Sequence, residues 1–463
     1  MKNLDYLFKT LTEHIAATDA SGYTIQYPPA FTWRALAQTQ VIQAWRSLLR
    51  RGDISKIGLY VHVPFCASRC EFCRYHSEEE TDPAAIADYL EDLKTEARRY
   101  SGLFRTVPFK TLYIGGGTPS LLREQDLIRF FRDLNSLFDL RYCQQISFEA
   151  TPHTLNRKKL AILKKYKVNR LTLGVQSLDP NVLRINKRKQ TAAEVYSAYR
   201  YARQLAIPYI NIDLMAGLPG QSLASFLATL SAIIRVRPDT IHLHPFYPTP
   251  FTNFIRREQT LTPEAMDIRN RMCNLGAQMM TRAGYRPTPF DAPSLSPAAR
   301  NIHLSDAVEF NGPFLGLGCG AVSHATGYLR YRNQDNPPAY HARLRRGTLP
   351  IERGIRVDAK DEMIYFATAH LRYGALLKVH FKELFGCSLN QVFKRPILYL
   401  QKRGILAQDK AALFFQDRNI SSYLIYSKYF YRPSIVNRYI SSLGRRPAEG
   451  RRLSSEELRY INL

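Results

Sequence analysis

The run Tyr60-Val-His-Val-Pro-Phe-Cys-Ala-Ser-Arg-Cys-Glu-Phe-Cys-Arg-Tyr75 carries three cysteines within eight residues. They are Cys66, Cys70 and Cys73, spaced C-x3-C-x2-C, and they follow a short apolar stretch. A structural zinc site uses four ligands, commonly in paired C-x2-C units, and a disulfide framework needs an even number of cysteines. Three clustered thiolates without a local fourth suit instead a cubane iron–sulfur cluster in which one iron lacks a protein ligand. An open metal position is typical of a catalytic site, because an exchangeable ligand must bind there.

Outward from this run, apolar strand-like segments alternate with amphipathic helical segments. The predicted strands are Gly58–Val63, Thr111–Ile114, Gln145–Ala150, Arg170–Val175, Tyr209–Leu214 and Thr240–His244. The predicted helices between them are Ala84–Arg99, Glu124–Phe138, Asn156–Lys165, Ala192–Gln204 and Ser222–Ile234. Such alternation predicts parallel βαβ units. Six strands fit an α/β fold with an open, partial TIM-type (β/α) barrel, whose chemistry belongs at the carboxyl ends of the strands.

The chain divides into five predicted segments. These are an N-terminal lead-in (1–55), the partial barrel (56–255), an extension with a glycine-rich strand (256–353), a C-terminal domain (354–444) and a mobile tail (445–463). The C-terminal domain shows three helical patterns and then a short strand at Ala412–Phe415, which favours a winged-helix-like α+β unit. The stretch Asp291–Asn311 is expected to be irregular.

The composition favours a cytoplasmic enzyme. Seven cysteines are an odd and low number for 463 residues, which argues against a secreted disulfide framework. Neither a signal peptide nor a membrane helix is predicted, because the N-terminus and the rest of the chain lack a suitable apolar stretch. The net charge of +26 leaves three interpretations open: a solvated surface, an anionic small substrate, or nucleic acid. Nucleic acid is the least favoured, since the Arg-Arg pairs are dispersed.

Five motifs on successive predicted strands carry a family resemblance. They are Y-V-H-V-P-F-C (60–66), G-G-G-T-P (115–119), S-F-E-A-T-P (147–152), G-V-Q-S-L (174–178) and N-I-D-L-M-A-G-L-P (211–219). With the cysteine spacing, the chain resembles the radical S-adenosylmethionine (SAM) superfamily, in the oxygen-independent coproporphyrinogen III oxidase-like branch. That branch includes heme chaperones, anaerobic heme-degrading enzymes and class C methyltransferases. The resemblance covers roughly Gly58–Ser323, with a weaker match over Gly354–Tyr431.

The resemblance implies a [4Fe-4S] cluster held by Cys66, Cys70 and Cys73, and two SAM molecules. The cluster-bound SAM would contact Tyr60, Gly116, Glu149 and Val322. The second SAM would contact Phe72, Gly117, Thr118, Gln176, Arg188 and Asp213. The side-chain-free run of Gly115, Gly116 and Gly117 would let the backbone approach the SAM ammonium group closely. Glu149 and Asp213 lie in matching positions at the ends of two predicted strands, where a carboxylate can accept ribose hydroxyls, and the fork of Arg188 suits a SAM carboxylate.

Two departures from the family pattern narrow the choice between the possible reactions. The oxidase carries a further cysteine two residues past the third cluster ligand, where this chain has Tyr75. The heme chaperones carry H-N-x-x-Y-W, where this chain has Leu304-Ser-Asp-Ala-Val-Glu309, so heme binding by that route is not expected. His62, His242 and His244 are interpreted as packing residues near strand ends, with a proton relay left open. Among the cysteines outside the cluster motif, Cys319 is the exception to watch, because it lies in the glycine-rich turn.

The functional expectation is radical chemistry on a tetrapyrrole or another planar heterocycle, with class C-type methyl transfer or a related outcome. The alternatives are the oxidative decarboxylation of coproporphyrinogen III and, in another class, a heme chaperone. The expected partners are a planar, anionic small-molecule substrate and an electron donor such as flavodoxin or ferredoxin. Neither nucleic acid nor membrane is expected, and the chain is expected to be a monomer. The sequence assigns no catalytic residue beyond the cofactor contacts.

Overall fold

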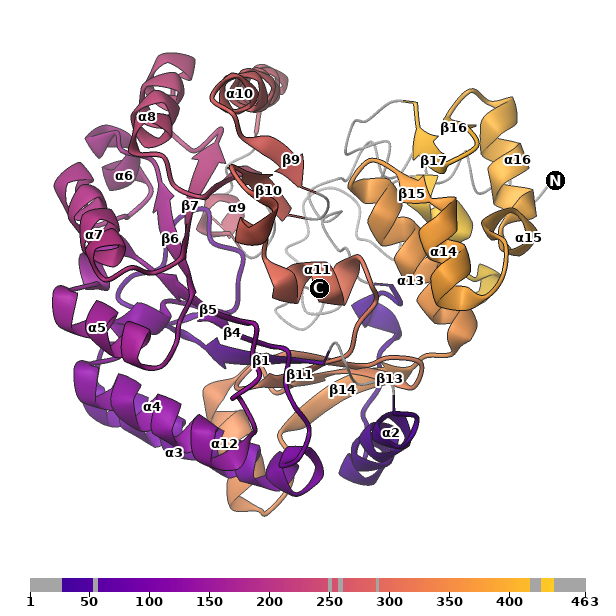
Figure 1. Cartoon of the computed structure of the whole chain (residues 1–463), viewed down its shortest axis with the longest axis horizontal. Helices are drawn as coiled ribbons and strands as arrows, with labels where there is room; N and C mark the ends of the chain where they lie inside the picture. Colours follow the sequence, from indigo (N-terminus) through magenta and orange to yellow (C-terminus); the bar gives the residue numbers. More distant parts are fainter. Residues whose placement is uncertain are drawn as a thin grey trace.

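The computed structural model describes residues 27–52, 57–248, 252–256, 261–288, 291–416 and 426–436. Its main body is a curved sheet with helices on the outer side (Figure 1). The twelve strands follow the order β14-β13-β12-β11-β1-β4-β5-β6-β7-β8-β10-β9. A smaller body, orange to yellow in Figure 1, holds the C-terminal helices and a three-stranded sheet.

Seven neighbouring strands at the centre of the large sheet run parallel. They are β11 (Phe314–Leu317), β1 (Gly58–Val63), β4 (Thr111–Gly116), β5 (Gln145–Ala150), β6 (Arg170–Gln176), β7 (Tyr209–Ala216) and β8 (Thr240–Pro245). Six of them match the predicted strands to within two residues. Their apolar positions, such as Leu59, Val61 and Val63, are fully buried. This is expected of parallel strands that are covered on the helical side.

The sheet continues on both sides through antiparallel strands. On one side lie β12 (Val322–Ala325), β13 (Leu329–Asn333) and β14 (Ile351–Arg356); on the other lie β10 (Asp291–Ser294) and β9 (Arg286–Thr288). The edge strands β14 and β9 do not pair with each other in the described part of the chain. The predicted α/β fold with an open partial barrel is therefore confirmed.

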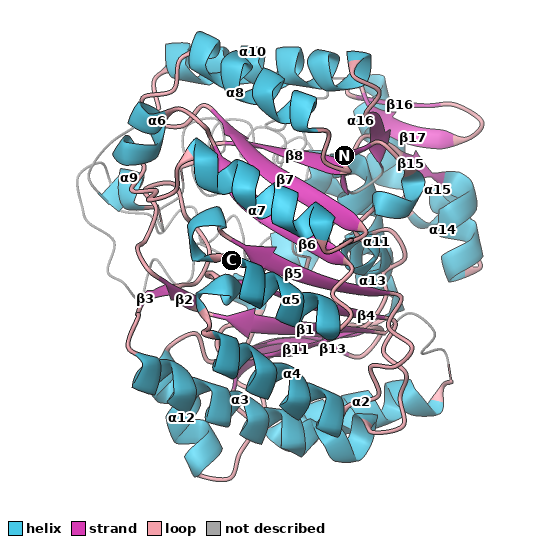
Figure 2. Ribbon diagram, turned by 60° about the vertical axis from the view of Figure 1, so that its left-hand side comes forward, coloured by secondary structure: helices cyan, strands magenta, loops and turns pink. Residues whose placement is uncertain are grey.

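The helices that follow the parallel strands cover the outer face of the sheet (Figure 2). They are α3 (Pro83–Phe104), α4 (Glu124–Leu137), α5 (Arg157–Lys165), α6 (Pro180–Ile185), α7 (Ala192–Gln204) and α8 (Leu223–Val236). Local sequence sets their starts. Asp82 accepts a hydrogen bond from the amide of Ala84 and precedes a proline, and Thr191 forms a capping box with Glu194.

Further helices pack around this frame. They are α2 (Gln38–Arg50), α9 (Asn253–Arg256), α10 (Pro263–Arg282), α11 (Ile302–Val308) and α12 (Pro337–Arg345). The buried Trp45 of α2 donates its indole hydrogen to the hydroxyl of Tyr331 on β13, at 2.8 Å. The described end of the lead-in is thus part of the main body. In α12, the Tyr340 hydroxyl donates to the buried carboxylate of Glu96 on α3, at 2.6 Å.

The smaller body has its own apolar core. Its helices are α13 (Ala359–Arg372), α14 (Lys378–Phe385), α15 (Leu389–Val392) and α16 (Lys394–Lys402). Its antiparallel sheet has the order β15 (Leu376–Leu377), β17 (Ala412–Phe415), β16 (Leu406–Gln408). The predicted boundary at residue 354 falls inside β14, which belongs to the large sheet. The winged-helix-like assignment of this unit stays a prediction.

Residues 1–26 of the predicted lead-in and the whole predicted tail, 445–463, lie outside the described residues. Across the residues that the structure does describe, none of the helices is both long and apolar enough to cross a membrane.

Candidate active site

A cavity of about 430 Å³ opens at the carboxyl ends of the parallel strands. It is lined by the loop after β1 and by residues of β4, β5, β6, β7 and β8. The start of α11 adds Asn301, His303 and Leu304. This is the position at which barrels of parallel strands carry their chemistry, because the strand ends bring different loops together.

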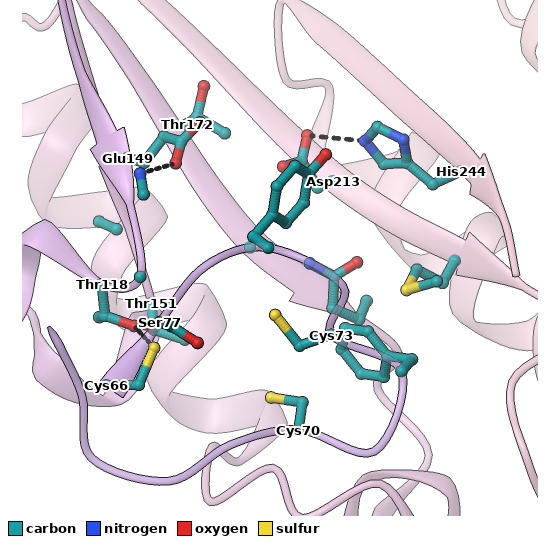
Figure 3. Close-up of a pocket in the computed structure, with 18 of the residues that line it drawn as sticks. Cys66, Cys70, Cys73, Ser77, Thr118, Glu149, Thr151, Thr172, Asp213 and His244 are labelled. Atoms are coloured by element: carbon teal, nitrogen blue, oxygen red, sulfur yellow. Dashed lines mark hydrogen bonds and ion pairs between the residues drawn. The ribbon is translucent and has the colours of Figure 1, made fainter. Parts of the chain in front are cut away.

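The three predicted cluster ligands lie on one loop of this cavity. Cys66 ends the short strand β2 (Phe65–Cys66), which pairs with β3 (Glu78–Glu79), and Cys70 and Cys73 lie between the two strands. All three thiols are free and line the cavity. Figure 3 shows their side chains directed toward a shared space. The loop is tied to the turn after α6, because Lys187 Nζ lies 3.1 Å from Glu71 Oε1.

The surroundings of the thiols fit an iron–sulfur cluster. Burial, together with the charges of the other two cysteines, raises the pKa of Cys73 to about 11, and burial also raises the pKa of Cys66. Three adjacent thiolates therefore need a cationic centre between them, since metal ligands must be deprotonated. Thr118 Oγ1 lies 3.4 Å from Cys66 Sγ, and Arg188 Nη1 donates to Cys70 Sγ at 3.7 Å. These contacts orient the ligands and favour their charged form.

The glycine run at the end of β4 packs closely against the cysteine loop. Gly116 has a φ of +121°, a conformation that favours glycine. A Cβ added at Gly117 would lie 2.7 Å from the carbonyl oxygen of Phe65. The amides of Gly117 and Thr118 donate to the carbonyls of Val63 and Phe65 at 2.8 and 2.7 Å. The run is thus required where β4 meets the loop, and the amides of Gly117 and of the following Thr118 are engaged inside the protein.

Glu149 ends β5 as a buried carboxyl with two donors. The Tyr113 hydroxyl donates to Oε1 at 2.5 Å, and the Gly116 amide donates to Oε2 at 3.2 Å (Figure 3). Burial raises the pKa of Glu149 to about 7, although the Tyr113 hydrogen bond opposes this shift. The carboxyl group can therefore carry or release a proton near neutral pH inside the cavity.

Asp213 lies on β7 and faces β8. Its Oδ1 accepts a hydrogen bond from Asn211 Nδ2 at 2.6 Å and lies 3.9 Å from His244 Nε2 (Figure 3). Asn211 in turn accepts from the buried Thr240 hydroxyl at 2.7 Å. This buried chain holds the Asp213 carboxylate in one orientation at the cavity wall.

Gln176 and Arg188 lie where β6 ends. Gln176 has a left-handed backbone (φ +68°) at a register shift between β6 and β7. Arg188 donates to the carbonyl of Gly174 and to Gln190 Oε1, in addition to its contact with Cys70. Both predicted SAM contacts therefore line the cavity, and Arg188 also contacts the cysteine loop.

The structure brings most of the predicted site residues to this cavity. The following line it: Tyr60, Cys66, Cys70, Phe72, Cys73, Gly116, Gly117, Thr118, Glu149, Gln176, Arg188 and Asp213. Gly115 and Val322 are not among its lining residues. The carbonyl of Val322 packs against Gly316, where an added Cβ would lie 2.1 Å from it. Tyr75 lines the cavity and is 57% exposed.

Sequence reasoning missed several residues of the cavity. Arg170 and Thr172 alternate along β6 and face inward, as the period of a strand predicts. His303 comes from α11, which lies in the stretch that the sequence suggested was irregular, so this prediction was wrong. Its Nδ1 lies 2.8 Å from the Thr111 hydroxyl. His153 lines the cavity with both ring nitrogens buried and without a hydrogen-bond partner among the described residues.

The cavity lining is basic. Its acidic residues are Glu149 and Asp213, whereas its basic residues are Arg69, Arg74, Arg170, Lys187, Arg188 and Lys189. Two carboxyl groups against six Arg and Lys side chains give a lining that favours an anionic ligand.

Comparisons with known proteins agree with this geometry. Residues 60–233 match the family model of the radical SAM superfamily. The heme chaperone HemW of Haemophilus influenzae is 27% identical over 76% of this chain and 91% of its own length. The oxygen-independent coproporphyrinogen III oxidase of Salmonella typhimurium is 25% identical over 78% of this chain and 84% of its own length.

The fold is also that of a solved member of this group. The structure of coproporphyrinogen III oxidase (HemN) from Escherichia coli superimposes with a TM-score of 0.74 and 22% sequence identity. The match covers 88% of this chain and 96% of that chain. Residues 60–233 therefore form a radical SAM domain, and the chain as a whole is similar to oxygen-independent coproporphyrinogen III oxidases and heme chaperones.

Proposed function

We propose that this chain holds a [4Fe-4S] cluster through Cys66, Cys70 and Cys73 and uses SAM to modify a planar, anionic tetrapyrrole. The observation that carries the proposal is the convergence of three free thiols in a basic cavity at the strand ends. The radical SAM domain supports the cofactors, and the relatives named as heme chaperone and coproporphyrinogen oxidase support the substrate class.

The side chains around the cluster position its ligands and restrict access to it. Thr118 and Arg188 contact the sulfurs of Cys66 and Cys70 and so fix their orientation. A reduced cluster held by these residues would supply the electron for cleavage of SAM to methionine and a 5′-deoxyadenosyl radical. The protein's task is then to align a substrate carbon and to exclude water and oxygen.

We assign the cluster-bound SAM to Tyr60, Gly116 and Glu149, which line the cavity beside the cysteine loop. The Glu149 carboxyl lies at the strand end, where it can hydrogen-bond ribose hydroxyls. Gly115 and Val322 stay predictions that rest on the resemblance alone. For a second SAM we propose Phe72, Gly117, Thr118, Gln176, Arg188 and Asp213, all of which line the same cavity.

Removing the Asp213 carboxylate tests this second SAM site. We expect Asp213→Ala to lower the binding stoichiometry from two SAM molecules to one, because the ribose loses its acceptor. Anaerobic equilibrium dialysis with the cluster-loaded protein measures the stoichiometry, and the iron content shows whether the cluster is intact. Asp267→Ala, an exposed change on α10, is the control and should bind two. A wild-type stoichiometry of one would contradict the second site.

For the substrate, the six basic side chains of the lining suit ring carboxylates, which Arg forks bind bidentately. Tyr247 adds an aromatic ring at the end of β8, with the Arg269 guanidinium 4.4 Å from the ring centre. We favour methyl transfer or related radical chemistry over decarboxylation, because Tyr75 stands where the oxidases carry a further cysteine.

Product analysis tests the reaction directly. Anaerobic turnover with reductant, SAM and candidate tetrapyrroles should yield both 5′-deoxyadenosine and S-adenosylhomocysteine, together with a methylated product seen by mass spectrometry. A mass loss equal to two decarboxylations would instead establish the oxidase reaction. Formation of 5′-deoxyadenosine without S-adenosylhomocysteine would contradict methyl transfer.

A heme chaperone is the second candidate function. The observation that favours it is the similarity to heme chaperones over 91% of the length of the Haemophilus influenzae protein. Titration of the purified protein with heme separates the two functions. A saturable, one-to-one change in the heme absorption spectrum, without SAM turnover on any tetrapyrrole, would favour the chaperone; no saturable change would exclude it.

A further inference from the structure

Three metal-ligating side chains converge on the wall of the cavity opposite the cysteine loop. Asp213 of β7 pairs in register with His242 of β8, and His244 lies two residues further on the same face of β8. One ligand atom from each of the three lies within 4.8 Å of the others. The two imidazole rings lie 3.8 Å apart, measured between ring centres. All three residues line the cavity.

We propose that Asp213, His242 and His244 bind a divalent transition-metal ion, as a second metal centre in addition to the cluster. Two imidazoles and one carboxylate suit Zn²⁺, Fe²⁺ or Co²⁺, and three protein ligands leave positions open for water or substrate. None of the cluster cysteines belongs to this ligand set. The proposal does not depend on the tetrapyrrole or on methyl transfer.

The protonation states of the two histidines agree with a ligand role. Burial and the neighbouring His244 and Arg170 hold the pKa of His242 well below its usual value, and burial and Arg74 lower the pKa of His244 to about 4. The neutral form of an imidazole ring offers a lone pair, which is the form that binds metals. The Asp213 carboxylate supplies the negative charge that a divalent ion needs beside these two arginines.

A second layer of residues orients the carboxylate ligand. Asn211 donates to Asp213 Oδ1 at 2.6 Å, and the buried Thr240 hydroxyl donates to Asn211 Oδ1 at 2.7 Å. Hydrogen bonds of this kind set the direction and basicity of a metal ligand. The hydrogen-bonded chain from Thr240 through Asn211 to Asp213 therefore suits a carboxylate that binds a metal ion at this wall.

Metal binding requires a small closure of the ligands. Bonds of about 2.0–2.2 Å from a tetrahedral ion to nitrogen and oxygen place ligand atoms roughly 3–3.5 Å apart. Atoms at the present upper separation of 4.8 Å must therefore approach each other by roughly 1.3–1.8 Å. An ion at this position would act as a Lewis acid on a molecule bound in the cavity.

Zinc binding to the cluster-loaded, full-length chain tests the proposal. After incubation with Zn²⁺ alone and gel filtration, metal analysis should give one zinc per chain in addition to the cluster iron. X-ray absorption at the zinc edge should show nitrogen and oxygen neighbours at about 2.0–2.1 Å and no sulfur at about 2.3 Å. His242→Gln and His244→Gln should each lose the zinc while the iron content is unchanged. Asn211→Ala should weaken zinc binding about 10- to 100-fold.

His303→Gln is the matched control, because His303 lines the same cavity but is not part of this ligand set. It should retain one zinc. A sulfur shell around the zinc, or equal zinc in wild type and His244→Gln, would overturn the metal site. Because Asp213 is also proposed to contact a second SAM, zinc should reduce SAM stoichiometry from two to one. If zinc binds and two SAM molecules still bind, the metal site stands and Asp213 is not a contact of the second SAM.

Discussion

Cys70→Ala is expected to abolish both the broad visible absorption of the iron–sulfur cluster and all SAM cleavage. Cys70 is the middle of the three proposed cluster ligands, and its sulfur accepts a hydrogen bond from Arg188 at 3.7 Å. Losing it leaves a second iron without a protein ligand, so the cubane no longer has the three thiolates that hold it. Anaerobic reconstitution, followed by iron and sulfide analysis and measurement of 5′-deoxyadenosine, checks the outcome.

Cys387→Ala is the control for this change. Cys387 lies between α14 and α15 in the smaller body, is also a free cysteine, and is not among the cavity-lining residues. The control should bind wild-type amounts of iron and cleave SAM at the wild-type rate. A Cys70→Ala protein that retains cluster and cleavage would remove the cysteine loop as the cluster site.

Glu362→Ala is expected to give the largest loss of stability. The Glu362 side chain is 4% exposed at the junction between α13 and the large sheet. It lies 2.8 Å from His324 Nε2 and 3.3 Å from Arg330 Nη2, and it accepts from the Gly327 amide at 2.7 Å. Removing it leaves the Arg330 charge buried without its carboxylate, which costs about 3–5 kcal/mol of unfolding free energy.

Chemical denaturation of the anaerobic protein measures this loss, with Glu383→Ala as an exposed control that should change stability by less than about 0.5 kcal/mol. The contribution of Glu362 to the free energy of unfolding changes with pH in a defined direction. His324 and Arg330 hold the pKa of Glu362 well below its ordinary value, against the effect of burial. Its stabilising contribution is therefore present above the unfolded pKa of about 4.3 and is lost as the pH falls. An equal loss of stability in both variants would contradict the role of this ion pair.

The sequence predicts the central strands of the fold well, because a single sequence pattern identifies them. Buried parallel strands are short apolar runs, and each is followed by an amphipathic helix of regular period. Gly58–Val63 and Gln145–Ala150 were predicted with the bounds that the structure has. The alternation also places the carboxyl ends of the strands together, which is why most of the predicted contacts meet in one cavity.

The edges of the sheet were not predictable in the same way. β13 carries the charged residues Arg330 and Arg332, and both are buried because Glu362 and Glu352 pair with them. A single sequence does not show a partner that lies 20 or 32 residues away. α11 is only seven residues long, too short for a helical period to identify it. For this reason the sequence did not predict that His303 lines the cavity.

The wall formed by Asp213, His242 and His244 shows the same limit within the site. The sequence placed each residue on a strand and interpreted the histidines as packing. Their convergence depends on the register of β7 against β8, which no local pattern determines. Val322 was assigned to the SAM site by a motif match alone; it is not among the lining residues of the cavity, and its contact with SAM stays a prediction.

The central claim is that three thiolates hold a four-iron cluster whose remaining iron binds SAM. Electron paramagnetic resonance of the reduced, cluster-loaded protein, recorded with and without SAM, tests it most directly. We predict the signal of one reduced [4Fe-4S] cluster per chain, with g values that shift when SAM is added, because SAM coordinates the open iron. A spectrum that is identical with and without saturating SAM, or the absence of a four-iron signal, would contradict the account.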